Sequence, residues 1–147
     1  MERDERFALL AIGDAEAIMT LAETLLDTTD VTLITPPRVG MVMLQMRDPV
    51  VGETFYAGEV LVTEAQVTLG GHDGYAMRFR REPEPTLAAA ILDAALEAGH
   101  MLTPQILAHL TATAAAEQER QRADWHAVTQ TRLAFDLDDR PHPVAHP

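Results

Sequence analysis

Cysteine, serine and lysine are all missing from this chain of 147 residues. Without cysteine there is no disulfide, no thiolate ligand for zinc or an iron–sulfur cluster, and no thiol nucleophile. Without serine there is no G-x-S-x-G motif and no serine nucleophile. The 11 basic residues are all arginine, whose planar guanidinium suits carboxylates and phosphates, although codon usage alone can produce the same bias.

Long apolar runs are also missing. The N-terminus, Met1–Arg6, is charged and no apolar segment follows it, so a secretory signal is not expected. No run approaches the roughly 20 residues that span a membrane. The net charge of −12 and the pI of about 4.7 oppose binding to nucleic acid or anionic lipid. We expect a cytoplasmic protein without nucleic-acid or membrane partners.

Apolar residues recur at helical spacing in four segments, and capping residues mark most of their ends. These segments predict helices over residues 3–12, from Asp14 to about Asp27, from Pro83 up to Gly99, and from Thr103 to about Gln130. The second half of the last helix is almost wholly polar, with possible i, i+3 ion pairs between Glu117 and Arg120 and between Glu119 and Arg122. Such a stretch is either solvated or meets another protein.

Alternating apolar residues between the helices indicate β-structure. They predict strands over residues 31–35, 39–47, 53–69 and 75–80, with a turn from Gly70 to Gly74. In the third strand the apolar positions change from even to odd, which predicts a bulge or a break near Thr63 and Glu64. Alternatively, Thr63 caps a helical turn that begins at Glu64. The predicted fold is α+β: a small, mainly antiparallel sheet of about four strands, with two helices before it and two after it, the last one long.

One domain is predicted over residues 1–135, because a chain of this length fits one core. Residues 136–147 are acidic and proline-rich and are predicted to form a loose tail. Four methionines, Met41, Met43, Met46 and Met77, lie in predicted strands. Methionines there are expected to fill the core, whereas exposure on one side would indicate an adaptable binding surface.

Arginines are concentrated at the end of the predicted sheet. Arg78, Arg80 and Arg81 lie there, and Arg47 is grouped with them as a fourth candidate. Guanidinium groups bind anions and acidic partners, so these four are the candidate contact residues. The alternative is an exposed strand face with carboxylate neighbours.

Carboxylates and histidines give weaker signals. Glu53, Glu59, Glu64 and Asp73 surround the β-region and could act as an acid–base pair if burial raised one pKa, but a solvated face is favoured. No two of the six histidines stand at i, i+4 with a further ligand: His72, His100, His109, His126, His142 and His146. We therefore predict no catalytic residue, no metal site and no cofactor in this chain.

A long, gapped pattern crosses the middle of the chain. It reads Val39-Gly40-Met41-Val42-Met43-Leu44-Gln45-Met46-Arg47, then Gly52-Glu53-Thr54-Phe55-Tyr56-Ala57-Gly58-Glu59-Val60-Leu61-Val62-Thr63-Glu64-Ala65-Gln66-Val67-Thr68-Leu69, then Gly74-Tyr75. This order resembles the PhnG family of the bacterial carbon–phosphorus lyase system. The positions of the pattern taken as structural are Gly52, Phe55, Gly58, Glu59, Thr63 and Gly74. The order of the helices, including one that carries Asp93-Ala94, also fits.

The resemblance implies a specific role. PhnG-type chains are small subunits of a core complex with PhnH, PhnI and PhnJ. With PhnH, PhnI and the ATPase-like PhnL, they support transfer of ribose triphosphate from ATP to methylphosphonate, with release of adenine. Catalysis is attributed mainly to PhnI, and the later radical step to PhnJ. The resemblance implies a non-catalytic subunit whose partners are PhnI-, PhnH- and PhnJ-like, and whose isolated chain is inactive.

One departure from the family occurs after the last strand. Related chains often have Gly-Arg-Asp where this chain has Arg80-Arg81-Glu82. A glycine tolerates positive φ and close approach, which an arginine does not do easily. Partner or ligand contacts at this corner are therefore expected to differ from those of the family.

Two further functions stay open at this point. The arginines Arg47, Arg78, Arg80 and Arg81 could contribute directly to an ATP or phosphonate site. An independent enzyme using Glu53, Glu59 or Asp73 is the third reading, and we do not expect it. A subunit separated from its partners is expected to expose an apolar patch, or to form a homo-oligomer that covers it.

Overall fold

The computed structural model describes residues 1–138, and the side chains of residues 1–130. The described residues form four helices and three strands, so the predicted α+β class is confirmed. In chain order the elements are α1 (Arg3–Ile12), α2 (Ala15–Leu26), β1 (Thr32–Arg47), β2 (Thr54–Leu69), β3 (His72–Phe79), α3 (Pro83–Glu97) and α4 (Thr103–Asp138). The strands form one antiparallel sheet in the order β1-β2-β3.

The count of about four strands is one too high, because two predicted strands are one. β1 runs from Thr32 to Arg47 straight through Pro36 and Pro37, which were expected to end a strand. Proline is tolerated here because β1 is an edge strand, where a missing N–H need not break the ladder. The pairing shifts between Leu33 and Thr35 and again between Thr35 and Arg38, so β1 carries its irregularities beside the prolines.

The bulge was predicted in β2, near Thr63 and Glu64, but the irregularity lies in the partner strand β1. The pairing of β2 with β3 is unbroken from Val62 to Leu69. The change in alternation is nevertheless real, because Val62 and Thr63 are both buried and odd positions are buried after them. The irregularity of the sheet lies opposite this stretch, in β1, where the pairing shifts between Thr35 and Arg38.

Two hairpin turns connect the strands. Gly70 and Gly71 have φ of 57° and 83° and form a two-residue turn, so β3 begins at His72, earlier than expected. Both positive values fit the type I′ turn that joins antiparallel strands tightly. The turn between β1 and β2 is longer and ends at Gly52, whose φ is 77°.

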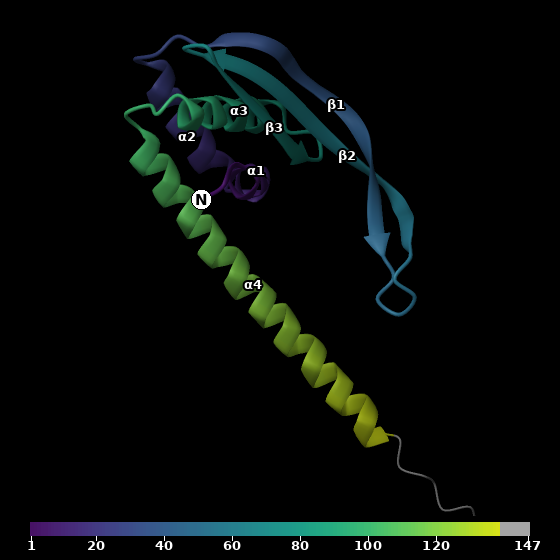
Figure 1. Cartoon of the computed structure of the whole chain (residues 1–147). Helices are drawn as coiled ribbons and strands as arrows, with labels where there is room; N and C mark the ends of the chain where they lie inside the picture. Colours follow the sequence, from purple (N-terminus) through teal and green to yellow (C-terminus); the bar gives the residue numbers. More distant parts are fainter. Residues whose placement is uncertain (139–147) are drawn as a thin grey trace, which may run out of the picture. The chain divides into compact units, whose positions relative to one another are not determined.

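The core lies between the sheet and α3. Figure 1 shows α3 against one face of the sheet, with α1 and α2 on the same side. Gly74 of β3 makes this packing possible, because a Cβ there would lie 2.1 Å from the carbonyl O of Ala90 and 2.5 Å from the backbone N of Ala94. No side chain fits in such a gap, so glycine at this position lets β3 lie directly against α3.

The N-terminal helices complete this core. Asp14 caps α2 as predicted, since its carboxylate accepts a 2.9 Å hydrogen bond from the backbone N of Ala17. Large side chains from α1, α2 and the start of α4 are almost fully buried: Leu10, Ile18, Leu25, Ile106 and Leu110. These residues and the inner face of the sheet hold together a first unit that covers Met1–Thr113.

The second unit begins at Ala114, within α4, and is described by itself. The two predicted ion pairs are present: Arg120 to Glu117 at 2.8 Å and Arg122 to Glu119 at 3.9 Å. α4 continues past the expected end at about Gln130 and includes residues 136–138, the start of the expected tail; the rest of that tail lies outside the described residues. No helix in the described part of the chain is long and apolar enough to cross a membrane.

Candidate functional site

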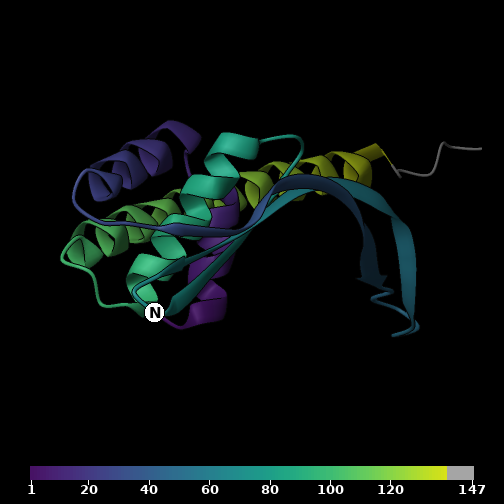
Figure 2. The same cartoon turned by 90° about the horizontal axis from the view of Figure 1, so that it is seen from above.

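We call residues 39–61, at the outer end of β1 and β2, the arm. β3 ends at Phe79, which pairs with Val62, so from Met41 and Leu61 outward β2 pairs with no strand but β1. In Figures 1 and 2 this hairpin curves away beyond the end of β3. A two-stranded ribbon is marginally stable in water by itself, so its exposure needs an explanation.

The arm is unusually apolar for an exposed element. Between 37% and 91% of each of the following side chains is exposed: Val39, Met41, Met43, Leu44, Met46, Val50, Val51, Phe55, Tyr56 and Leu61. Three of the four strand methionines belong to this set, so the expected core role is not the one they take. Exposed methionines and aromatic residues gathered in one place are typical of adaptable binding surfaces.

Apolar side chains occupy both faces of the arm. On one face Met41 lies opposite Leu61, and on the other Val42 lies opposite Val60. Farther out, Met46 lies opposite Phe55 on the second face. Because cross-strand neighbours point to the same side, neither face is a polar, solvent-adapted one.

The tip of the arm is held by its own hydrogen bonds. The Asp48 carboxylate accepts from the backbone N of Val50 at 2.7 Å and of Val51 at 3.0 Å. These two bonds, that from Val51 first, hold the pKa of Asp48 below its ordinary 3.8. The Arg47 Nε donates to the carbonyl O of Gly52 at 3.1 Å. The arm therefore ends in a defined turn rather than an unstructured loop.

A second feature is the corner where β3 turns into α3. The Thr63 hydroxyl donates to the carbonyl O of Arg80 at 2.7 Å and accepts from the backbone N of Glu82 at 3.0 Å. Arg80 has φ of 70°, the only positive φ of a non-glycine residue in the described chain. The corner thus has the backbone conformation that a glycine favours.

Arg78 is buried beneath this corner. Its Nη1 donates to the carbonyl O of Leu10 at 2.6 Å, its Nη2 to that of Gly13 at 2.9 Å, and its Nε to Glu82 at 2.8 Å. The first two acceptors lie at the C-terminal end of α1, where the helix dipole favours a cation. Arg78 therefore ties α1 to β3 and the start of α3.

The four predicted arginines do not converge. Arg78 and Arg80 line one hollow of about 330 Å³ together with Ala11, Ile12, Phe79 and Glu82. Arg81 does not line it, although it is exposed close by in sequence. Arg47 lies at the tip of the arm, opposite Thr54. Their role as anion or partner contacts stays a prediction.

Asp93, which the family pattern placed on a helix without giving it a role, is a buried group. Only 2% exposed, it accepts from the backbone N of Tyr75 at 3.1 Å and from the Arg3 guanidinium at 3.0 Å. The first bond satisfies an outward-facing N–H at the edge of β3, and the second attaches α1. The sequence signals were its place in the Asp93-Ala94 pair and its position as a carboxylate within an apolar stretch of the helix.

A polar cluster lies on the sheet beside α1. The Tyr75 hydroxyl donates to Glu64 at 2.7 Å, Arg38 pairs with the same carboxylate, and the Tyr75 ring stacks on Phe7 with centroids 5.8 Å apart. The hydrogen bonds from Tyr75 and Arg38 lower the pKa of Glu64 below 4.5. Burial, helped by the bond to Glu64, raises the pKa of Tyr75 to about 12.

The other candidate carboxylates and histidines take structural or separate positions. The Asp73 carboxylate accepts from the Thr68 hydroxyl at 2.8 Å, whereas Glu53 and Glu59 lie on the arm. His100 Nδ1 accepts from the backbone N of Leu102 at 3.1 Å, so its Nε2 is the atom that donates to Thr29, at 2.8 Å. In the part of the chain described, no group of three His, Asp or Glu side chains could hold a metal ion.

The six pattern residues divide into two groups. Gly52 and Gly58 have positive φ, Thr63 holds the corner, and Gly74 lets β3 approach α3, so each has a role within the chain. Phe55 and Glu59 are exposed on the arm and fill no such role. The fold does not explain these two, whereas a surface that meets another protein would.

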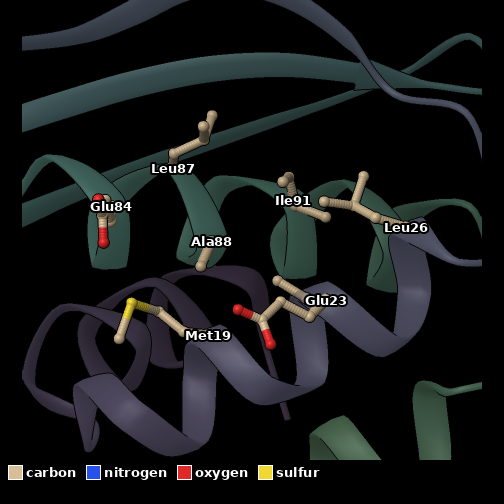
Figure 3. A pocket seen from close by; sticks show the side chains of 8 residues that line it. Met19, Glu23, Leu26, Glu84, Leu87, Ala88 and Ile91 are labelled. Carbon is tan, nitrogen blue, oxygen red and sulfur yellow. The ribbon is translucent and has the colours of Figure 1, made fainter.

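One apolar groove lies elsewhere in the first unit. It has a volume of about 210 Å³, and Figure 3 shows it between α2 and α3, with Met19 and Leu26 on one side and Leu87 and Ile91 on the other. Glu23 and Glu84 line it too, but their carboxylates lie apart in Figure 3. The groove has no convergent polar groups, so it lacks the features of an enzyme site.

Two comparisons with known proteins complete the description. A family model described as "Phosphonate metabolism protein PhnG" matches residues 1–137. This match covers nearly the whole chain and confirms the resemblance that the central pattern gave. A comparison with curated protein sequences gave no match.

Proposed function

The chain belongs to the PhnG family, which makes it a phosphonate metabolism subunit, and from that premise we propose that the arm is the surface through which it joins its assembly. The carrying observation is the exposure of ten large apolar side chains on residues 39–61 of a chain that folds its own core elsewhere. Soluble monomers seldom expose apolar side chains so densely unless another protein covers them.

The family resemblance supplies the biochemical role in this proposal. The chain acts as a non-catalytic subunit that supports transfer of ribose triphosphate from ATP to methylphosphonate, with release of adenine. Its partners are PhnI-, PhnH- and PhnJ-like subunits, and it works in the cytoplasm. The arm would position the chain on a larger partner, where a rigid subunit can order the surfaces that surround a reaction centre.

Exposed apolar residues on the second unit support a further contact. Trp125 is 72% exposed and Val128 is 60% exposed, three residues apart on α4. Tryptophan is enriched among residues that dominate protein–protein binding energy. We include this stretch of α4 in the proposed partner surface.

Reconstitution tests this function directly. The chain is co-expressed with PhnI-, PhnH- and PhnJ-like proteins, and the mixture is separated by size exclusion. We expect the chain to co-elute with the PhnI-like subunit, and adenine release from ATP in the presence of methylphosphonate, with the PhnL-like protein added, to depend on its presence. A chain that elutes alone, or an equally active assembly that lacks it, contradicts the proposal.

The alternative, in which arginines of this chain touch ATP or phosphonate, rests on Arg80 and Arg81. Arg78 is buried and already donates to three acceptors, two of them at the C-terminal end of a helix, where negative partial charge disfavours an anion. In this reading Arg80→Ala with Arg81→Ala raises the KM of the assembly for ATP without changing assembly itself. An unchanged KM in an intact assembly excludes it.

A further inference from the structure

The outer edge of β1 is an open strand edge. Arg80 N donates to the carbonyl O of Leu61 at 2.8 Å, so the backbone of Leu61 faces the β3 side of β2. Met41 is the cross-strand neighbour of Leu61 in β1, and its N–H and C=O must therefore point away from β2. The same alternation gives Val39 and Met43 outward-facing backbone groups.

This edge has none of the features that prevent the addition of another strand. From Val39 to Met46 β1 has no proline and no charged side chain, and the extra residue near its outer end, Ala57, belongs to β2. The inner part of β1 is different, because Pro36, Pro37 and two register shifts disturb its edge. The outer edge of β2 is also disturbed, by that same extra residue and by the carboxylate of Glu59.

A partner that covers the apolar side chains of the arm also removes water from these backbone groups. Buried N–H and C=O groups need hydrogen-bond partners, or the contact loses stability. A partner that packs on one face of the arm would supply no hydrogen-bond partner for these edge groups, and it would leave the other face exposed. A strand added in the plane of the sheet satisfies the edge and extends both faces at once.

The charges on β1 indicate what kind of strand fits. Arg38 and Arg47 are its only charged residues, and they flank the apolar run in a chain whose net charge is −12. Both are exposed, and they lie nine residues apart, or about 30 Å along an extended strand. Antiparallel pairing of Val39–Met46 with the same segment of a second copy would place Arg38 opposite Arg47 of that copy, and like charges directly opposite destabilise a sheet.

We propose that an extended segment of another subunit adds to the edge of β1 over Val39–Met46, and that this segment is apolar over about eight residues with acidic side chains at its ends. This inference rests on the proposed function, because it specifies how the arm holds its partner. The backbone groups of Val39, Met41 and Met43 form the ladder. Arg47 selects the carboxylate at one end, and Arg38, whose Nε already pairs with Glu64, uses its other guanidinium N–H groups at the other end.

Selective labelling of methionine amides tests the ladder. The chain labelled with ¹⁵N-methionine is exchanged into D2O alone and within the reconstituted assembly, quenched, and read by NMR after dissociation. We expect exchange at Met41 and Met43 to slow at least about tenfold on assembly, as for amides that enter a sheet. Met46, whose N–H faces β2, should be slow in both states, and Met101, exposed on a turn, should stay fast. Unchanged exchange at Met41 and Met43 overturns the inference.

Matched variants test the same edge through affinity. Met41→Pro removes an outward N–H without touching the bonds to β2, whereas Met41→Leu keeps both the N–H and an apolar side chain. The proline variant should weaken assembly at least about tenfold and the leucine variant less than about twofold. A slow Met46 amide in Met41→Pro shows that its hairpin has folded. Assembly of folded Met41→Pro at wild-type affinity overturns the inference.

The charge selection has its own pair of variants. Arg47→Glu should weaken assembly, and more so at low salt, whereas Arg47→Lys should keep most of the affinity. Equal affinities for the two variants contradict acidic side chains at the ends of the partner segment.

A chain that joins the assembly with fast Met41 and Met43 amides refutes only this inference, whereas a chain that never joins it refutes the proposed function as well. Protection of these amides in an isolated dimer would assign the edge to a second copy and overturn it.

Discussion

The inner half of β2, from Val62 to Leu69, and its outer half, from Thr54 to Leu61, belong to one continuous strand in very different surroundings. The inner half pairs with a strand on each side and has core residues at most 5% exposed: Val62, Thr63, Ala65, Val67 and Leu69. The outer half pairs on one side only, and none of its side chains is buried. The apolar character of both halves is similar, so burial inside the chain cannot explain the outer one.

This difference separates the residues that stabilise the fold from those that are available to bind a partner. α3 covers the inner half and, with α1 and α2 packed against it, closes a core that does not involve the arm. Changes in the inner half should therefore act on stability, and changes in the arm should act on binding.

Gly74→Ala should destabilise the chain by about 3 kcal/mol or more, because the new Cβ would lie 2.1 Å from the carbonyl O of Ala90 and force β3 away from α3. Gly40→Ala, on the arm, meets nothing within 4 Å and should change the free energy of unfolding by less than about 0.5 kcal/mol. Urea unfolding of both variants measures the contrast. Equal losses would show that the arm belongs to the cooperative core.

Asp93→Ala should cost about 2–3 kcal/mol, since it leaves the Tyr75 N–H without its acceptor in a buried place. Arg3→Ala, which removes the half-exposed partner of the same carboxylate, should cost less than about 1 kcal/mol. Thermal unfolding of the two variants shows which of them loses more stability. A larger loss for Arg3→Ala would mean that the ion pair, and not the bond to β3, is the important contact.

Tyr75→Phe should cost about 1 kcal/mol near neutral pH and less in acid, where the protonated Glu64 is a weaker acceptor. The pKa of Glu64 is lowered in the folded chain, so its bonded carboxylate contributes stability above its unfolded pKa, near 4.5, and that contribution is lost as the pH falls through the lower folded pKa. Unfolding free energies of wild type and variant from pH 7 to pH 3 should therefore converge. A gap that stays constant across this range contradicts the assigned bond.

Substitutions at Arg80 should have the smallest effect. Its φ of 70° is costly for a side chain with a Cβ and worst for a β-branched one. Arg80→Gly should change stability by less than about 1 kcal/mol, in the stabilising direction, whereas Arg80→Val should destabilise. Chemical denaturation measures the unfolding free energies of the two variants. If Arg80→Val were more stable than Arg80→Gly, the positive φ at this position would be contradicted.

Much of the fold could be predicted because local signals were strong. Asp14 as a cap, glycines at turns and helical spacing of apolar residues placed most of the elements. The merging of two strands through Pro36 and Pro37 could not be predicted, since it depends on β1 being an edge strand, a fact of sheet order. The role of Arg78 was also hidden, because an arginine that binds the end of a helix far away in sequence has the same local pattern as an exposed one.

The candidate surface was only half visible in the sequence. The pattern that identified the family includes Phe55 and Glu59, and the methionines of β1 raised the possibility of an adaptable surface. Alternation alone, however, assigns apolar strand residues to the core. Only the length of β3, which stops opposite Val62, shows that no third strand of the first unit pairs with the arm.

The most direct test of the account is the affinity of an arm variant for the partner subunits. Met43→Asp combined with Phe55→Asp places charge on the exposed arm, and Met101→Asp places it on a side chain 77% exposed outside the arm. The account predicts that the arm variant keeps its unfolding free energy within about 1 kcal/mol but loses co-elution with the PhnI-like subunit, while Met101→Asp retains it. A folded arm variant that binds as tightly as wild type would contradict the central claim.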